Sequence, residues 1–217
     1  MFDPIITANQ VFSNAVPQGG TRAQCYDSLM RQAGFVLAGG RSARMGVDKA
    51  LLLYRGLPLA ARIAAEVLAA AGSVSIVGDP ARYGALSFPV VADLVPGLGP
   101  IGGLLTALSV SQADWNLVAA CDMPGLTRDD LAALLAAASA HDGDCVVAVS
   151  PGGRRHPLCA VYHRRCLPAV SEAVSSKRLK MMDLVATLRP LIVPLNDPAH
   201  LGNINTPQDW LSFAHGN

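Results

Sequence analysis

The chain of 217 residues is 51% hydrophobic and 15% charged, with a formal net charge of +1. This length and apolar fraction favour one large α/β domain with a well-filled core. The near-neutral charge argues against a general nucleic-acid binder, because affinity for a phosphate backbone normally needs a surplus of Lys and Arg on one face.

The five cysteines are an odd number and form no C-x-x-C pair. Such usage is typical of a reducing compartment, so we expect a cytoplasmic protein. No apolar run reaches the roughly 18 residues of a membrane span, and no membrane partner is expected.

Residues 1–33 mix Pro, Gly and polar residues around isolated apolar ones, without a sustained helical or strand period. A segment of this composition buries too little apolar surface to fold alone, so we expect a poorly ordered N-terminal extension. Residues 34–217 are predicted to form a single domain.

The most informative stretch is residues 34–49, GFVLAGGRSARMGVDK. Its apolar start, residues 35–38, suits a short strand buried on both faces. The loop that follows combines three glycines with three cations, Arg41, Arg44 and Lys49. Glycines leave backbone N–H groups open to an anion, and Arg and Lys favour phosphate. The loop is therefore predicted to bind a polyphosphate, the alternative being a strand-to-helix turn with solvated basic side chains.

This loop matches neither common phosphate-binding pattern. A Walker A loop needs Lys directly after its last Gly, whereas Gly46 is followed by Val47 and Asp48. The dinucleotide fingerprint needs glycines at its first, third and sixth positions, which Gly39, Gly40 and Gly46 do not supply. The order LAGG, RMG and DKA resembles the signature of nucleotidyltransferases that attach a nucleoside monophosphate to a phosphorylated acceptor. Among these it is most similar to the molybdenum cofactor guanylyltransferase family.

Beyond the loop, helical and strand patterns alternate. Residues 57–71 have apolar side chains at helical spacing before Gly72, and residues 73–77 and 88–92 are predicted to be short strands. Asp93 follows the second strand, where open α/β sheets collect ligands. A solvated loop acid or a helix cap would explain the same residue.

A glycine-rich segment, residues 96–103, leads into a predicted helix over residues 104–110. A helix entered in this way offers N–H groups and the positive end of its dipole to an anion. Close packing of the helix on the first strand would explain the same glycines, and the two explanations are compatible.

Residues 115–121 form the most continuous apolar run and are predicted to be a central strand. Asp122 follows at its carboxyl end, where a carboxylate opposite a cationic loop can hold Mg²⁺ against phosphate oxygens. The tetrapeptide CDMP resembles the metal-binding Asp motif of the family. Thr127 is predicted to open a helix over residues 128–140.

The last third of the chain is predicted to contain strands at residues 144–149, 156–162 and 191–195 and helices at residues 166–174 and 181–187. Near the end of the chain, Thr206 is a good N-cap with Pro207 at the first helical position. This capping leaves the side chains of Asn203 and Asn205 without a local role.

The predicted elements favour a three-layer α/β/α fold around a mostly parallel, Rossmann-like sheet. The return strand near His156 indicates a mixed edge. The candidate ligands Gly39, Lys49, Asp93 and Asp122 all come just after a strand, where this architecture places its site.

The resemblance covers residues 34–210 and includes the segment Asn203-Ile204-Asn205-Thr206-Pro207. It implies an enzyme that uses GTP and Mg²⁺ to convert molybdopterin cofactor to its guanine dinucleotide form, with pyrophosphate leaving. It also implies site roles: nucleotide contacts from Leu37, Ala38, Gly39 and Gly40, phosphate contacts from Lys49 and Arg44, a guanine contact from Asp93, Mg²⁺ and nucleotide contacts from Asp122, a further metal contact from Asn205, and an acceptor pocket lined by Arg154, Arg155 and His156.

One position departs from the family pattern. Gly78 stands where members often carry Asn, so one expected base or ribose contact is missing. A cytidylyltransferase acting on the same pterin is therefore kept as an alternative. A non-catalytic nucleotide-binding adaptor is a further alternative from another class, although such a protein has no need of Lys49 and Asp122. The segments around Arg154 and Asn203 fit a sugar-phosphate or isoprenoid-type nucleotidyltransferase poorly. The expected partners are GTP, molybdopterin cofactor and, transiently, molybdoenzymes or other cofactor-biosynthesis proteins.

Overall fold

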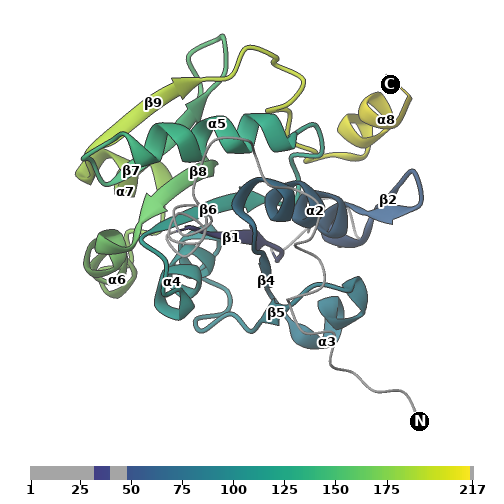
Figure 1. Cartoon of the computed structure of the whole chain (residues 1–217). Helices are drawn as coiled ribbons and strands as arrows, with labels where there is room; N and C mark the ends of the chain where they lie inside the picture. Colours follow the sequence, from purple (N-terminus) through teal and green to yellow (C-terminus); the bar gives the residue numbers. More distant parts are fainter. Residues whose placement is uncertain (1–31, 40–47, 216–217) are drawn as a thin grey trace, which may run out of the picture.

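The computed structural model describes residues 32–39 and 48–215, and Figure 1 shows how their elements are arranged. A seven-stranded sheet runs through the described chain in the order β5-β4-β1-β6-β8-β7-β9. Its strands are β1 (Gln32–Leu37), β4 (Ser75–Val77), β5 (Val90–Val91), β6 (Trp115–Ala120), β7 (Cys145–Val149), β8 (Arg155–His163) and β9 (Pro190–Pro194).

Most neighbouring strands in this sheet are parallel. The pairs β1–β4, β1–β6, β4–β5 and β7–β9 are parallel, whereas β8 runs antiparallel to β6 and β7. The predicted fold class is confirmed. The antiparallel return strand does not form the outer edge, however, because β7 and β9 lie beyond it.

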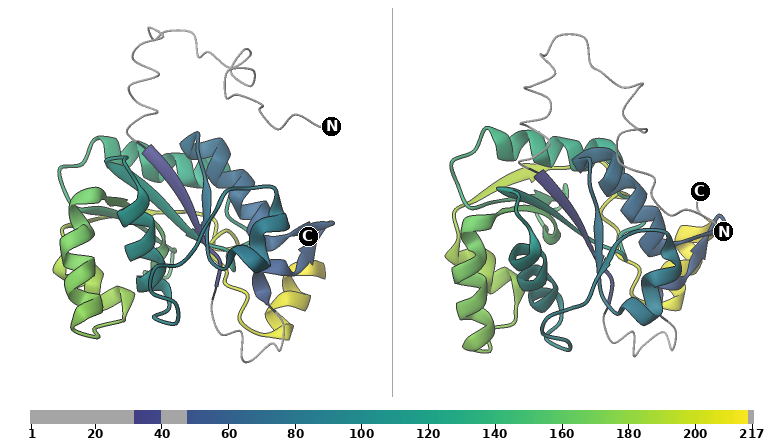
Figure 2. Two further views of the ribbon diagram at one scale, coloured as in Figure 1. Left: turned by 90° about the horizontal axis from the view of Figure 1, so that it is seen from below. Right: turned by 60° about the horizontal axis from the view of Figure 1, so that its bottom comes forward.

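Helices cover both faces of the sheet (Figure 2). One face packs against α2 (Leu59–Ala71) and α5 (Arg128–Ser139) through residues such as Val36 and Leu117. The other face packs against α4 (Pro100–Val110), α6 (Leu167–Ser175) and α7 (Met181–Thr187) through residues such as Phe35 and Val118. Successive residues of a strand point to opposite faces, so β1 and β6 contribute to both cores, as their apolar runs require.

The remaining elements are short. They are η1 (Lys49–Leu51), the hairpin β2 (Leu53–Tyr54) and β3 (Leu57–Pro58), α3 (Pro80–Tyr83), η2 (Gly84–Leu86), η3 (Arg164–Cys166) and α8 (Pro207–His215). Of these, η3 follows β8 at the end of the sheet opposite the carboxyl end of β1, where the Arg164 N–H donates to the Asp114 oxygen. The ring of Tyr54 in the hairpin lies 4.6 Å, centroid to centroid, from the ring of Phe213 in α8. This contact holds the C-terminal helix against the hairpin.

Two predicted helix starts were wrong. Residues 57–58 belong to the hairpin and not to α2, and α4 begins at Pro100 instead of residue 104. Asp79 caps the one-turn helix α3. Gly72 ends α2 in a left-handed conformation, as predicted. Within the described residues no helix is both long and apolar enough to cross a bilayer.

Candidate active site

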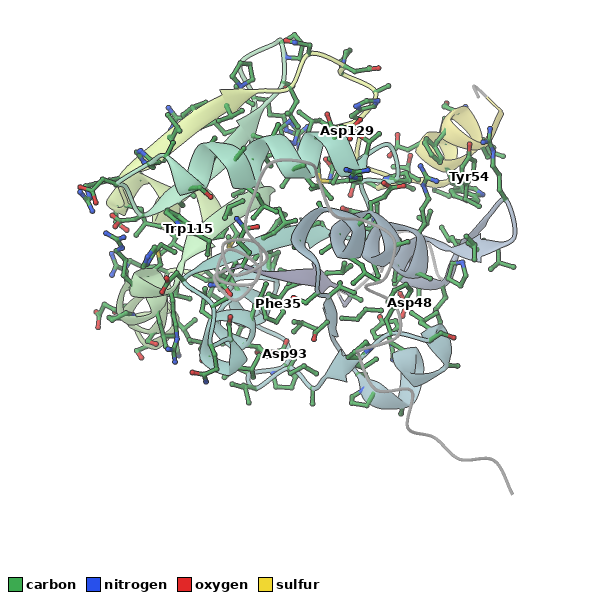
Figure 3. The ribbon with its side chains drawn as sticks, in the orientation of Figure 1. Phe35, Asp48, Tyr54, Asp93, Trp115 and Asp129 are labelled. Atoms are coloured by element: carbon green, nitrogen blue, oxygen red, sulfur yellow. The ribbon has the colours of Figure 1, made fainter. Side chains whose placement is uncertain are left out.

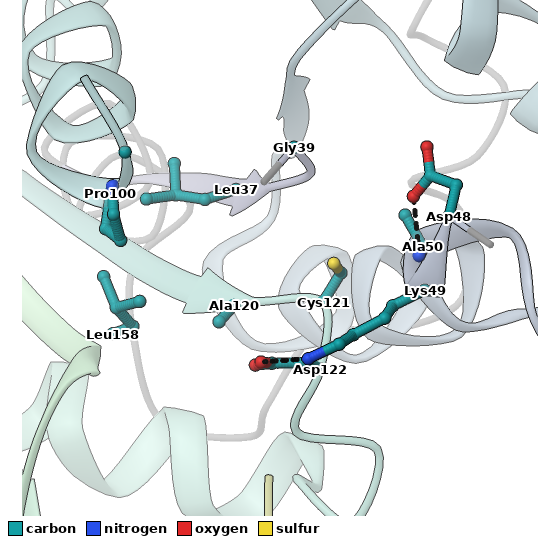
Figure 4. A pocket seen from close by; sticks show the side chains of 11 residues that line it. Leu37, Gly39, Asp48, Lys49, Ala50, Pro100, Ala120, Cys121, Asp122 and Leu158 are labelled. Atoms are coloured by element: carbon teal, nitrogen blue, oxygen red, sulfur yellow. Dashed lines mark hydrogen bonds and ion pairs between the residues drawn. The ribbon is translucent and has the colours of Figure 1, made fainter. Parts of the chain in front are cut away.

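A cavity of about 220 Å³ opens where β1 and β6 end side by side. Leu37 is the register partner of Ala120, so the residues that follow both strands emerge at the same edge. Figure 4 shows the side chains around this cavity. Its lining consists of Leu37, Gly39, Asp48, Lys49, Ala50, Gly99, Pro100, Ala120, Cys121, Asp122 and Leu158.

Lys49 reaches across this cavity to Asp122. Asp48 caps η1 by accepting a hydrogen bond from the Ala50 N–H at 3.0 Å, which fixes where the lysine begins. The Lys49 Nζ then lies 3.9 Å from Asp122 Oδ2, with the two side chains 16% and 23% exposed. Lys49, from the end of the glycine loop, therefore lies next to Asp122, which follows the central strand.

The two asparagines near the C-terminus complete the cluster. Lys49 Nζ donates to Asn205 Oδ1 at 3.0 Å, and Asn203 Nδ2 donates to Asp122 Oδ1 at 3.2 Å. The N–H of Ile204 also donates to the backbone oxygen of Asp122 at 2.8 Å. This segment thus lies directly against the strand end that carries the acid.

A capped helix fixes the far end of the asparagine segment. Asp209 Oδ2 accepts from the N–H groups of Asn205 and Thr206 at 2.8 and 2.9 Å, and Thr206 Oγ1 accepts from the Asp209 N–H at 3.1 Å. These bonds hold the pKa of Asp209 below its usual range. The predicted N-cap at Thr206 is confirmed, and the same set of bonds fixes the backbone of Asn205.

The environment of Asp122 favours a cationic partner. Burial raises the pKa of its carboxyl, and this effect exceeds the opposing effects of the Lys49 charge and the Asn203 hydrogen bond. An ionised carboxylate held in this position is stabilised by a nearby cation, whether an ammonium group or a metal ion.

The oxygen donors at this site suit Mg²⁺ carried by a nucleotide. Asp122 and Asn205 present carboxylate and amide oxygens, the hard donors that Mg²⁺ prefers. Among the described residues no group of three or more His, Cys, Asp or Glu side chains could hold a metal unaided. Mg²⁺ commonly uses one or two protein oxygens and takes its other ligands from water and phosphate, so the set fits.

Comparison with known proteins identifies the family. The family described as "MobA-like NTP transferase domain" matches residues 34–190. The chain belongs to this family. It is 32% identical to the "Probable molybdenum cofactor guanylyltransferase" of Flavobacterium johnsoniae, over 81% of this chain and 92% of that protein. It is 33% identical to the "Molybdenum cofactor guanylyltransferase" of Cupriavidus metallidurans, over 80% and 89%.

Solved structures show the same fold. Molybdopterin-guanine dinucleotide biosynthesis protein A from Archaeoglobus fulgidus has a TM-score of 0.73 at 23% identity, covering 84% of this chain and 96% of that one. A nucleotidyl transferase from Methanothermobacter thermautotroptrophicus has a TM-score of 0.66 at 20% identity, covering 86% and 99%. This MobA-like chain is accordingly a nucleotidyltransferase with a three-layer fold.

Gly102 and Gly103 in the first turn of α4 serve packing in this MobA-like chain. A Cβ on Gly103 would lie 3.1 Å from the Leu37 side chain, and a Cβ on Gly102 would lie 3.1 Å from the Val95 oxygen. The N–H groups of both glycines donate to the Gly99 carbonyl at 3.1 and 3.4 Å. The start of the helix nevertheless lines the cavity through Gly99 and Pro100, so an anion contact there stays a prediction.

Asp93 is not among the described residues that line the cavity with Lys49 and Asp122. Its Oδ1 accepts from the Val95 N–H at 3.1 Å and from the hydroxyl of buried Thr106 in α4 at 3.0 Å. Figure 3 shows Asp93 and Asp129 of α5 on opposite sides of the sheet. These bonds fix the loop after β5, and the guanine contact stays a prediction.

The remaining residues predicted to contact the nucleotide or its phosphates belong to the segment after β1. Ala38 is buried and donates its N–H to the Val77 oxygen at 2.9 Å, whereas Gly39 has a φ of +142° that favours glycine. Gly40 and Arg44 lie outside the described residues.

None of the three residues predicted to line the acceptor pocket, Arg154, Arg155 and His156, is among the described residues that line this cavity, although Leu158 on β8 is. On the same strand, Arg155 is exposed and His156 is buried, with 6% of its surface accessible. Burial, aided by the charge of Arg154, lowers the pKa of the His156 imidazole, which favours its neutral form. The acceptor contacts of these residues stay predictions.

Proposed function

We propose that this chain is a molybdenum cofactor guanylyltransferase that transfers GMP from GTP to molybdopterin cofactor and releases pyrophosphate. The observation that carries the proposal is the convergence of Lys49, Asp122, Asn203 and Asn205 at the ends of β1 and β6. Relatives that bear this activity in their names align over about four fifths of the chain, which supports the assignment.

The proposed reaction needs no nucleophilic side chain. A phosphate oxygen of the acceptor attacks the α-phosphorus in line with the departing pyrophosphate, so the protein contributes by positioning and by charge stabilisation. Lys49 would leave Asn205 and Asp122 to bind triphosphate oxygens, and Arg44 would add a second cation. Asp122 and Asn205 would hold Mg²⁺, which neutralises charge on the triphosphate when bound.

The same proposal places the protein in the cytoplasm, as a single domain with transient protein partners. The described cysteines Cys121, Cys145, Cys159 and Cys166 are buried and free, a state that fits a reducing cytoplasm. One sheet carries both motif-bearing strands, which supports a single domain, although β1 begins at Gln32, two residues before the predicted boundary at residue 34. Transient contact with molybdoenzymes would deliver the product.

Release of pyrophosphate tests the proposed activity. The protein is incubated with Mg²⁺, molybdopterin cofactor and GTP, CTP, ATP or UTP in parallel, with an acceptor-free reaction as the control. We expect acceptor-dependent release with GTP.

The reaction with CTP distinguishes a guanylyltransferase from the second candidate, a cytidylyltransferase. A Cβ on Gly78 would lie 2.3 Å from the Ala38 oxygen, so this position has no room for a base-contacting side chain. Preferential turnover of CTP would assign the chain as a cytidylyltransferase. Nucleotide binding without turnover in any reaction would favour the adaptor.

A further inference from the structure

Asp48 lines the cavity beside Lys49, yet the proposed reaction gives it no part. Both of its carboxylate oxygens are occupied. Oδ1 accepts from the Ala50 N–H at 3.0 Å, and Oδ2 accepts from the hydroxyl of Tyr83 at 2.8 Å. Arg82 Nη1 lies 3.6 Å from the same Oδ2, but its side chain is 64% exposed. The buried partner of Asp48 is therefore Tyr83.

Tyr83 is built firmly into the core. It ends α3, is 1% exposed and belongs to the cluster that includes Val36 and Ile76. A Cβ on Gly78 would lie 2.6 Å from its ring, so the glycine leaves the space that the ring fills. Burial raises the pKa of the Tyr83 hydroxyl, with a smaller effect from Asp48, which keeps it protonated and able to donate.

A loose carboxylate at position 48 would be harmful to the proposed site. It would lie next to the ammonium group that must bind phosphate, and opposite charges only a few ångströms apart attract each other. It would also repel a triphosphate in the cavity. A hydrogen bond from a buried hydroxyl holds the carboxylate in place, and bonds to charged acceptors are stronger than neutral ones.

We propose that Tyr83 and Asp48 form a positioning pair that fixes the start of η1, so that Lys49 points at Asp122 and Asn205. This inference rests on the proposed function for its consequence in catalysis. Its structural core, the orientation of Lys49, can be measured without any nucleotide.

The first test measures how fast acetic anhydride acylates Lys49 in the nucleotide-free protein at constant pH. The exposed Lys177 of the same molecule serves as an internal reference. Tyr83→Phe removes only the hydroxyl, and we expect the ratio of Lys49 to Lys177 labelling to rise about threefold to tenfold. Tyr162→Phe is the matched control, because it removes another buried tyrosine hydroxyl, bonded to the Pro157 oxygen at 2.8 Å, and should leave the ratio unchanged.

The second test measures the affinity for GTP and Mg²⁺ by calorimetry without acceptor. We expect Tyr83→Phe and Asp48→Asn each to weaken binding about fivefold to tenfold, and the double variant to be no more than about twofold worse than either. If the losses in binding free energy of the two single variants add up in the double variant, the two residues act independently and the positioning pair is refuted.

An unchanged labelling ratio in a folded Tyr83→Phe protein would overturn the positioning role. If that variant does not fold, an unchanged ratio in Asp48→Asn would overturn it equally. If the labelling ratio rises in Tyr83→Phe but the wild-type protein binds no nucleotide, the positioning pair is supported and the proposed function is contradicted.

Discussion

Replacing Asp122 by Asn separates the catalytic role of the carboxylate from its effect on stability. The amide is nearly the same size, and its oxygen can still accept the bond from Asn203 Nδ2, which is 3.2 Å long in the structure. The substitution removes the negative charge that would hold Mg²⁺. We therefore expect kcat for guanylyl transfer to fall by at least about 10³-fold while the protein stays folded.

The stability effect follows from two opposing contributions. Burial raises the pKa of Asp122 above its ordinary value of 3.8, so the ionised form costs the fold about 1.4 kcal/mol per unit of that rise. This cost is present above the folded-state pKa and disappears below the ordinary value. The ion pair with Lys49, 3.9 Å long and partly exposed, contributes about 1 kcal/mol or less, and the net rise in pKa already includes its opposing effect. At pH 7 the free energy of unfolding should therefore change by less than about 1 kcal/mol.

Urea denaturation at pH 7 and pH 4, together with release of pyrophosphate, measures both effects. Any stability gained by Asp122→Asn at pH 7 should shrink toward pH 4, because the wild-type carboxylate then takes up its proton. Asp122→Ala serves as the comparison and should lose about 1 to 3 kcal/mol, since it leaves Asn203 without an acceptor. A loss of that size in Asp122→Asn would refute the burial argument, and normal turnover would refute the metal role.

Other substitutions test separate parts of the account. Lys49→Ala should weaken binding of GTP with Mg²⁺ by about tenfold or more and slow transfer, and unchanged kinetics would remove Lys49 from the mechanism. Gly78→Ala should lower the free energy of unfolding by about 1 to 3 kcal/mol because its Cβ would meet the Ala38 oxygen at 2.3 Å. The control is Gly84→Ala, because a Cβ at Gly84 would lie in open space and its φ is −59°. This control should be neutral or stabilising by up to about 1 kcal/mol. Equal losses of stability in the two variants, measured by urea denaturation, would contradict the packing argument. Arg189→Ala should lower thermal stability at pH 7 but not near pH 2. The arginine lowers the pKa of Asp144, and its contribution to stability is lost as that carboxylate is protonated. An equal loss at both pH values would show that the ion pair with Asp144 is not the origin of the effect.

Local sequence patterns were sufficient for the main elements of the fold. The apolar run before Asp122 is the central strand β6, and the helix predicted over residues 181–187 has those bounds in the structure. The patterns failed at the second strand of the short hairpin, because Leu57 and Pro58 continue the apolar spacing of α2. The turn formed by Arg55 and Gly56, both with positive φ, was the available signal.

The interior position of β8 could not be predicted from strand order along the chain. A return strand after a short turn is compatible with either an edge or an interior place in a sheet. The choice depends on where β9 pairs, which is a contact distant in sequence.

The site was predictable where it depends on strand ends and was missed where it depends on side-chain pairing. Lys49 and Asp122 follow from their motifs, because parallel strands bring such residues to one edge. The bond between Lys49 and Asn205 spans 156 residues, and the bond between Tyr83 and Asp48 spans 35. No local period indicates either contact, so the roles of Asn203 and Asp48 emerged only from the structure.

The central proposal is that Asp122 would hold a divalent cation that neutralises charge on the triphosphate, while Lys49 would bind the phosphates. Crystals of the protein with Mn²⁺ and a non-hydrolysable GTP analogue would test it directly through the anomalous signal of the metal. We expect a metal peak about 2.1 Å from an Asp122 carboxylate oxygen and from a phosphate oxygen, with Lys49 Nζ in contact with the triphosphate. A nucleotide bound elsewhere, or a metal with no contact to Asp122, would contradict the account.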